Sequence, residues 1–197
     1  MIRSFVGIGI PEGVADTLQA QQAGLPAGRA VPPENFHITL AFLGEHPMPV
    51  VEDVHYALEA ISAPGFSIRF EGIGLFGERS RTVQALVRPE PGLTHLRARV
   101  LDAARSVGIA LPRTRFQPHV TLARIPSGAT GEDIVRLEAF VASRAGFALG
   151  PVPVGSFALY RSRLGRSGAS YEEMATYPLA PGPLSPEPQA PDLLGGG

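Results

Sequence analysis

"ENFHITLAFLGE", residues 34–45, and "RFQPHVTLARI", residues 115–125, decide the fold because each sets polar side chains inside an otherwise apolar run. The polar pairs are His37 with Thr39 and His119 with Thr121. Residues two apart in a β-strand face the same way, so each histidine is expected to share a face with its threonine. If the two halves of the chain pack with approximate two-fold symmetry, these four groups converge on one cleft.

The first stretch predicts a strand over residues 36–43 and the second a strand over 117–124. Counting by two puts His37, Thr39 and Ala41 on one face of the first strand and Ile38, Leu40 and Phe42 on the other. Arg124 lies five residues after His119, so a straight strand would point it away from the histidine's ligand. A bulge or a twist would be needed to bring it to the same place.

Apolar periodicity places the other elements around these two strands. Further strands are expected at 2–10, 66–76, 81–89, 154–161 and 171–178, and helices at 12–23, 50–62, 91–107 and 130–143. Turns are expected at 30–35 and 77–80, and a hairpin loop at 161–170. In each half a helix leads through a Pro-containing loop into the His-x-Thr-Leu strand. The irregular order of helices and strands favours an α+β fold with antiparallel strands over a doubly wound parallel sheet.

The charges of the chain are unevenly distributed. All 17 basic residues are Arg. Residues 1–66 hold two Arg against seven acidic residues, whereas residues 79–166 hold 14 Arg against five acidic residues. A codon bias toward Arg explains the absence of Lys equally well. The functional alternative is a basic surface for an anionic ligand, since the planar guanidinium can donate two hydrogen bonds to a phosphate.

Residues 1–179 are expected to form one domain of two lobes, with one His-x-Thr motif in each. Residues 180–197, "APGPLSPEPQAPDLLGGG", are rich in Pro and Gly and are expected to be disordered or extended. The N-terminal "MIRSFVGIGIPEGV" alternates and has no small-residue cleavage site, so a strand is expected there and not a signal peptide. No apolar run approaches the length of a membrane span, and a cytoplasmic protein is expected.

Other motifs point away from cofactor chemistry. "GIGLFG" at 72–77 matches Gly-x-Gly-x-x-Gly, but a turn and a strand are expected after it, where a dinucleotide site needs a helix. We therefore expect a strand whose glycines permit bends. The absence of cysteine excludes disulfides, Cys-ligated zinc and a Cys nucleophile. No spacing supplies a third metal ligand beside His37 and His119, so neither a metal nor a cofactor is expected.

Two imidazoles are the smallest set of groups for concerted acid–base chemistry near neutral pH. One accepts a proton while the other donates one, and two hydroxyls can hold the oxygens of a phosphate. The residues leave the order of the two histidines open, because the motifs are nearly symmetric.

At this point the sequence resembles the 2H phosphoesterases, and in particular the bacterial RNA 2′,3′-cyclic phosphodiesterases, also called 2′-5′ RNA ligases. The resemblance covers residues 1–179 and rests on "FVGIGIPEGV", "VPPENFHITLAFLG", "GLFGERSR", "FQPHVTLAR" and "ALYRSRLGRSGASYEEMATYPL". It implies a bilobal α+β fold with two antiparallel sheets, outer helices and a central cleft. Aromatic residues that the family often carries before "VPPEN" and after "GLF" are absent here, where Ala30 and Gln84 stand.

The resemblance implies metal-independent hydrolysis of RNA 2′,3′-cyclic phosphate ends to 2′-phosphates by a monomer, with reverse 2′-5′ ligation open to the same groups. It makes His37 the proton donor and His119 the proton acceptor, and it gives substrate binding to Thr39, Thr121 and Arg124. Two alternatives stay open: a phosphodiesterase for a small cyclic nucleotide or nucleotide ester, and a non-catalytic module that binds RNA or nucleotides.

Overall fold

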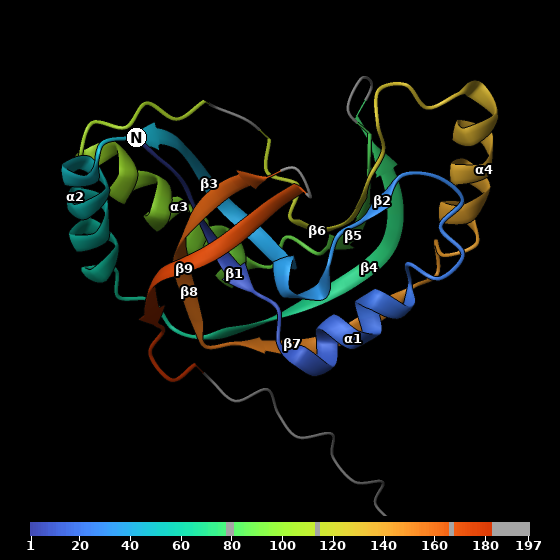
Figure 1. Cartoon of the computed structure of the whole chain (residues 1–197). Helices are drawn as coiled ribbons and strands as arrows, with labels where there is room; N and C mark the ends of the chain where they lie inside the picture. The colour runs from blue at the N-terminus through green and yellow to red at the C-terminus, as the bar shows by residue number, and fades with distance from the viewer. Residues whose placement is uncertain (78–80, 113–114, 166–167, 183–197) are drawn as a thin grey trace, which may run out of the picture.

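The computed structural model describes residues 1–77, 81–112, 115–165 and 168–182 of the chain. Within these ranges the elements are β1 (Ile2–Gly9), α1 (Glu12–Ala20), β2 (Arg29–Ala30), the 3-10 helix η1 (Pro33–Asn35), β3 (His37–His46), α2 (Met48–Glu59), β4 (Phe66–Phe76), β5 (Thr82–Val87), α3 (Pro91–Ser106), β6 (His119–Arg124), α4 (Gly131–Ala142), β7 (Ala148–Val154), β8 (Ser156–Gly165) and β9 (Gly168–Pro178). The α+β fold class predicted from the sequence is confirmed (Figure 1).

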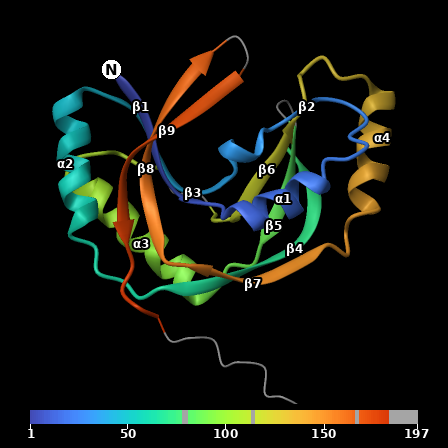
Figure 2. The same ribbon diagram turned by 60° about the horizontal axis from the view of Figure 1, so that its bottom comes forward.

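The strands form one nine-stranded sheet in the order β7-β4-β5-β6-β3-β1-β8-β9, with β2 paired to β6 beside this path. All pairs between these strands are antiparallel. The two predicted sheets are joined where β3 meets β6, through the register pair Ile38–Val120. Figure 2 shows the sheet curving like a U, with α2 and α3 outside one arm and α4 outside the other. The two strands that carry the histidine motifs are therefore neighbours at the centre of the sheet.

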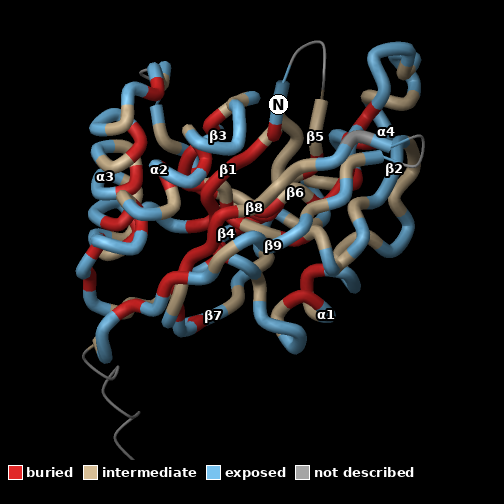
Figure 3. Tube along the Cα trace, turned by 60° about the vertical axis from the view of Figure 1, so that its left-hand side comes forward, coloured by how far each residue is buried: buried red, intermediate tan, exposed pale blue. Residues whose placement is uncertain are grey.

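The core lies between the outer face of the sheet and these helices. The 3.6-residue period of α3 puts Leu93, Leu96, Val100 and Ala104 on one face, and all four are fully buried. In α2 the same spacing buries Val51, Val54 and Leu58. Figure 3 shows buried residues running along the central strands and along the sides of α2 and α3 that face them. The helices thus support the strands from outside and leave the inner face of the sheet uncovered by them (Figure 2).

Glycine-rich β4 is a strand, as the sequence predicts for "GIGLFG". Gly72 has φ +83°, and its N–H donates to the Phe147 carbonyl at 2.6 Å, while the register with β5 skips from Phe70 to Ile73. The left-handed backbone at Gly72 is a conformation that glycine adopts without steric cost. The glycine therefore forms a bulge in β4 and is not part of a dinucleotide site.

Two stretches differ from the sequence prediction. Strand β7 was not predicted, because Gly150, Pro151 and Pro153 are poor strand formers. It pairs only with β4 at the edge of the sheet, where proline is tolerated. The predicted loop 161–170 is strand up to Gly165 and again from Gly168, and these two residues face each other in the hairpin. Residues 166–167, like residues 78–80 of the predicted turn, lie outside the described residues.

The predicted tail lies mostly outside the described residues, which end at Gly182. The Ala180 N–H donates to the Ala63 carbonyl at 2.9 Å and its own carbonyl accepts from Gly65 at 2.7 Å, so the chain is attached to the body up to this point. The division into residues 1–179 and 180–197 stays a prediction. Within the described ranges, none of the helices has the length and apolar character that crossing a bilayer requires.

Candidate active site

The structure brings the predicted site residues together in one cleft of about 500 Å³. Ile38 lies opposite Val120, and continuing this antiparallel register carries His37 toward Thr121 and Thr39 toward His119. The cleft is lined by Arg3, Phe5, His37, Thr39, Phe42, Thr82, Gln84, His119, Thr121, Arg124, Ser162, Ala169 and Tyr171. All five residues that the sequence singled out are in this set.

Both histidine rings are oriented by the same kind of hydrogen bond to a backbone carbonyl. The Nδ1 atom of His37 donates to the carbonyl oxygen of Asn35 at 2.8 Å, and the Nδ1 atom of His119 donates to that of Gln117 at 2.8 Å. A carbonyl oxygen can only accept, so each Nδ1 carries the hydrogen and fixes the tautomer. In each ring the Nε2 atom is left to take a proton from a ligand or to give one.

His37 lies in an aromatic pocket. Its ring centroid is 4.6 Å from that of Phe5 and 4.8 Å from that of Tyr171, which meets it edge-on. Burial lowers the pKa of His37 from its ordinary value, the Asn35 carbonyl opposes this, and the positive charges of Arg124 and His119 lower the pKa further. An anion in the cleft would offset both the burial and the charges, because it stabilises the imidazolium.

A bulge brings Arg124 into the cleft. In the ladder between β5 and β6, Gln84 faces Thr121 and the next residue, Val83, faces Ala123, so Leu122 is an extra residue in β6. The bulge reverses the alternation, and Arg124 consequently lies opposite Thr82 on the face that carries Thr121. This resolves the odd spacing between His119 and Arg124 in the sequence.

The same bulge recurs in β3 and corrects one prediction. Gly7 faces Thr39 and Val6 faces Ala41, so Leu40 is an extra residue in β3. Ala41 is therefore buried and does not share the face of His37, while Phe42 is 46% exposed and lines the cleft. The prediction for Ala41 and Phe42 was wrong because strict alternation holds only in a ladder without an extra residue.

The chemistry of the cleft suits an anion. The Arg124 guanidinium donates to the Tyr171 hydroxyl at 3.4 Å, and in the described part of the chain it forms no ion pair. No carboxylate among the described residues therefore neutralises its charge. The Gln84 amide donates to the Thr82 hydroxyl at 2.8 Å on the same wall. Two threonine hydroxyls, one amide and the Arg124 guanidinium can together hold the oxygens of a phosphate.

The remaining histidines lie elsewhere in the fold. His46 contacts the Leu43 carbonyl and His55 the Tyr177 hydroxyl, while His95 is exposed on α3. Over the residues described, no three His, Asp or Glu side chains come close enough together to hold a metal ion.

A second hollow, of about 470 Å³, lies beside β7 and residues 179–182. Its lining residues include no ionisable side chain. This hollow therefore offers no group for the acid–base chemistry that the histidine pair allows.

Sequence reasoning missed several residues of the cleft. Gln84 and Thr82 reach it because β5 alternates polar and buried residues beside β6, a pattern visible in "TVQALV". Tyr171 comes from β9, where the sequence showed no sign of a site. Its ring contacts His37, and its hydroxyl accepts a hydrogen bond from the Arg124 guanidinium. Tyr171 therefore links the two halves of the cleft.

Comparison with known proteins places the chain among phosphoesterases. A family model described as LigT like Phosphoesterase matches residues 8–83 and 87–171. An RNA 2′,3′-cyclic phosphodiesterase of Geobacillus stearothermophilus is 34% identical over 82% of this chain and 51% of its own length. One of Aeropyrum pernix is 34% identical over 77% of this chain and 85% of its own length. The chain thus spans about half the length of the first relative and most of the second.

Solved structures give the same grouping. The protein TT0787 of Thermus thermophilus superposes with a TM-score of 0.72 at 26% identity, covering 91% of this chain and 99% of that one. Escherichia coli LigT complexed with 3′-AMP superposes with a TM-score of 0.70 at 26% identity, covering 90% of this chain and 98% of that one.

Proposed function

Because the chain belongs to the LigT-like phosphoesterase family, we propose that it hydrolyses the 2′,3′-cyclic phosphate at the end of an RNA strand without a metal ion. One observation carries the proposal: two imidazoles with free Nε2 atoms stand on adjacent strands of one cleft. Beside them lie two threonine hydroxyls and the Arg124 guanidinium, which has no ion-pair partner among the described residues. The relatives from Geobacillus and Aeropyrum, both named RNA 2′,3′-cyclic phosphodiesterase, support the choice of substrate.

In the proposed reaction a water oxygen attacks phosphorus in line with the bond to the ribose O3′. His119 takes the proton of the water on its Nε2, and His37 gives its Nε2 proton to O3′ as the P–O3′ bond breaks. The product is a 2′-phosphomonoester. Thr39, Thr121 and Arg124 stabilise the charge on the phosphate oxygens in the transition state. The protons return by exchange with solvent, so no co-reactant is needed.

The order of the two histidines follows the family resemblance, with His37 as donor. Burial lowers the pKa of His37 and favours its neutral form in the empty cleft, whereas a donor must be protonated. The negative charge of the bound cyclic phosphate raises this pKa again, since opposite charges at short range favour the ionised form. The bound substrate thus favours the protonated form of His37, which the role of proton donor requires. In the joining reaction a 5′-hydroxyl replaces water as the nucleophile: His119 takes the proton of this hydroxyl, His37 protonates the departing O3′, and a 2′-5′ linkage is formed.

The test is turnover by the purified protein in the presence of EDTA, with the substrates offered side by side. We expect a short RNA ending in 2′,3′-cyclic phosphate to be hydrolysed at the same rate with and without the chelator. A 3′,5′-cyclic nucleotide serves as the representative small ester. Preferred hydrolysis of that ester would favour the small-nucleotide alternative, and binding of RNA without turnover would favour a non-catalytic module.

Loss of activity with EDTA, restored by one divalent metal, would show that the enzyme is a metallophosphodiesterase.

We further propose that the protein acts as a monomer in the cytoplasm. Size-exclusion chromatography with light scattering during turnover tests this point.

A further inference from the structure

A second pocket, of about 240 Å³, opens beside the cleft. It shares Thr39, Phe42 and His119 with the cleft but is not lined by His37. Its outer wall is made by α3 and by residues 111–112 and 115–117. The pocket and the cleft therefore adjoin at these three residues, on the His119 side of the site.

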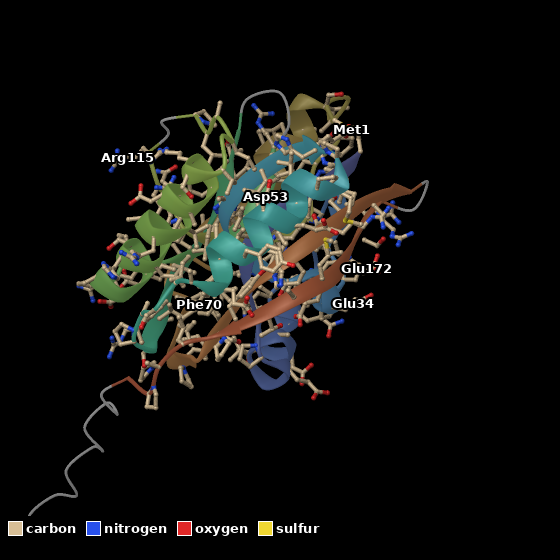
Figure 4. All side chains as sticks on the ribbon, turned by 90° about the vertical axis from the view of Figure 1, so that its left-hand side faces the viewer. Met1, Glu34, Asp53, Phe70, Arg115 and Glu172 are labelled. Atoms are coloured by element: carbon tan, nitrogen blue, oxygen red, sulfur yellow. The ribbon has the colours of Figure 1, made fainter. Side chains whose placement is uncertain are left out.

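Two arginines line this outer wall without an acidic partner. Arg97 and Arg115 form no ion pair and no hydrogen bond within the ranges that the structure describes, whereas Arg105 in the last turn of α3 pairs with Asp102. Figure 4 shows Arg115 beyond the end of α3, well separated from the labelled acidic residues Glu34, Asp53 and Glu172. The pocket therefore holds two positive charges that the described protein does not neutralise.

Packing alone does not account for Arg97. Its guanidinium carbon lies 4.5 Å from the centroid of the Phe116 ring, and this stacking fixes the plane of the group. The Nε atom is nevertheless buried and has no hydrogen-bond partner among the residues that the structure describes. Burial, together with the nearby charge of Arg105, lowers the pKa of Arg97 from its ordinary value, which is the mark of a desolvated cation without a counter-ion. A planar, pre-oriented donor with free N–H groups is suited to phosphate.

We infer that this pocket binds a phosphodiester of an RNA strand beyond the phosphate that reacts. The inference rests on the proposed function and makes an oligonucleotide, not a mononucleotide, the preferred substrate. The shared chemistry is one backbone phosphate held by Arg97 and Arg115. It can come from the strand that carries the cyclic end, or from a second strand whose 5′-hydroxyl replaces water beside His119 in the joining reaction.

The test compares kcat/KM of Arg97→Gln and Arg115→Gln on two substrates, a 2′,3′-cyclic mononucleotide and a short RNA with the same end. We expect the ratio of RNA to mononucleotide efficiency to fall roughly tenfold in each variant, as for a lost hydrogen bond to a charged group. The slope of log Kd against log salt for RNA should also become shallower by about 0.7, the value for one contact to a single strand. Arg99→Gln, on the same helix but outside the pocket, is the matched control and should leave the ratio unchanged.

A second experiment identifies which of the two RNA strands supplies the phosphate bound by Arg97 and Arg115. If hydrolysis of RNA keeps its efficiency ratio while joining to a 5′-hydroxyl strand falls roughly tenfold, the phosphate belongs to the second strand and the inference holds. The inference would be overturned if the Arg variants changed neither the RNA-to-mononucleotide ratio in hydrolysis nor the efficiency of joining. It would also be overturned if kcat/KM fell equally on the mononucleotide and on RNA. Binding of a 2′-phosphorylated RNA, followed by fluorescence anisotropy, separates the two proposals. If the wild type lacks turnover but the Arg variants bind this RNA more weakly than the wild type and Arg99→Gln, the proposed function fails and the subsite stands.

Discussion

Replacing either His37 or His119 by alanine is expected to lower kcat on RNA ending in 2′,3′-cyclic phosphate by roughly 10²–10⁴-fold, the usual contribution of a general acid or base. Each ring is fixed by a hydrogen bond from Nδ1 to a carbonyl two residues upstream, so each has one nitrogen for proton transfer. Alanine removes that nitrogen, and no other described histidine lines the cleft. The measurement is single-turnover kinetics of the wild type and both variants.

Two controls separate chemistry from folding. His95→Ala, on the exposed side of α3, removes a histidine without touching the cleft and should keep full activity. His37→Gln retains bulk against the Phe5 and Tyr171 rings, so it should melt close to the wild type by circular dichroism while staying inactive. Turnover within a few-fold of the wild type in either alanine variant would rule out the two-histidine mechanism.

Arg124→Gln is expected to lower kcat/KM by roughly 10²–10³-fold, the range seen when one preorganised donor to a developing anion is lost. The guanidinium reaches the cleft through the bulge in β6 and has no carboxylate partner among the described residues, so its charge is available to the phosphate. Arg124→Lys keeps the charge but not the planar fork and should recover part of the loss. Arg136→Gln, on exposed α4, is the matched control.

The same variant has a second readout that misfolding would not produce. The charge of Arg124 is one of the causes that lower the pKa of His37, so its removal should raise that pKa toward the ordinary value. A histidine NMR titration of the free protein should show His37 changing protonation at a pH below 6.5 in the wild type and at a higher pH in Arg124→Gln. An unchanged midpoint together with near-normal turnover would remove Arg124 from the site.

Much of this fold could be predicted from the sequence because the decisive pattern is local. The alternation around His37 and His119 requires strands, and the helix spacing of Leu93, Leu96 and Val100 requires a buried helix face. Composition also excluded whole classes of site, since a chain without cysteine has no thiolate chemistry. These features depend on neighbours within a few residues, where backbone geometry dominates.

What the sequence did not reveal depends on partners far along the chain. The bulges at Leu40 and Leu122 exist only relative to β1 and β5, so Phe42 was assigned to the wrong face of its strand. Tyr171 reaches His37 because β9 pairs with β8 in a hairpin. The contact between the two rings joins residues more than a hundred positions apart in the sequence. Strand β7 was missed because its prolines are tolerated only at an edge, and an edge is a property of the whole sheet.

In the proposed mechanism a fixed donor and a fixed acceptor act on opposite sides of one phosphorus atom. In-line attack makes the entering water, phosphorus and the leaving oxygen nearly collinear, so two histidines in fixed roles break one of the two ester bonds and not both. The most direct measurement is phosphorus NMR of the RNA product formed in EDTA, checked by a nuclease specific for 3′-phosphate ends. A 2′-phosphate that resists the nuclease is the predicted product. A mixture of 2′- and 3′-phosphates, or a 3′-phosphate alone, would contradict the assigned roles of His37 and His119.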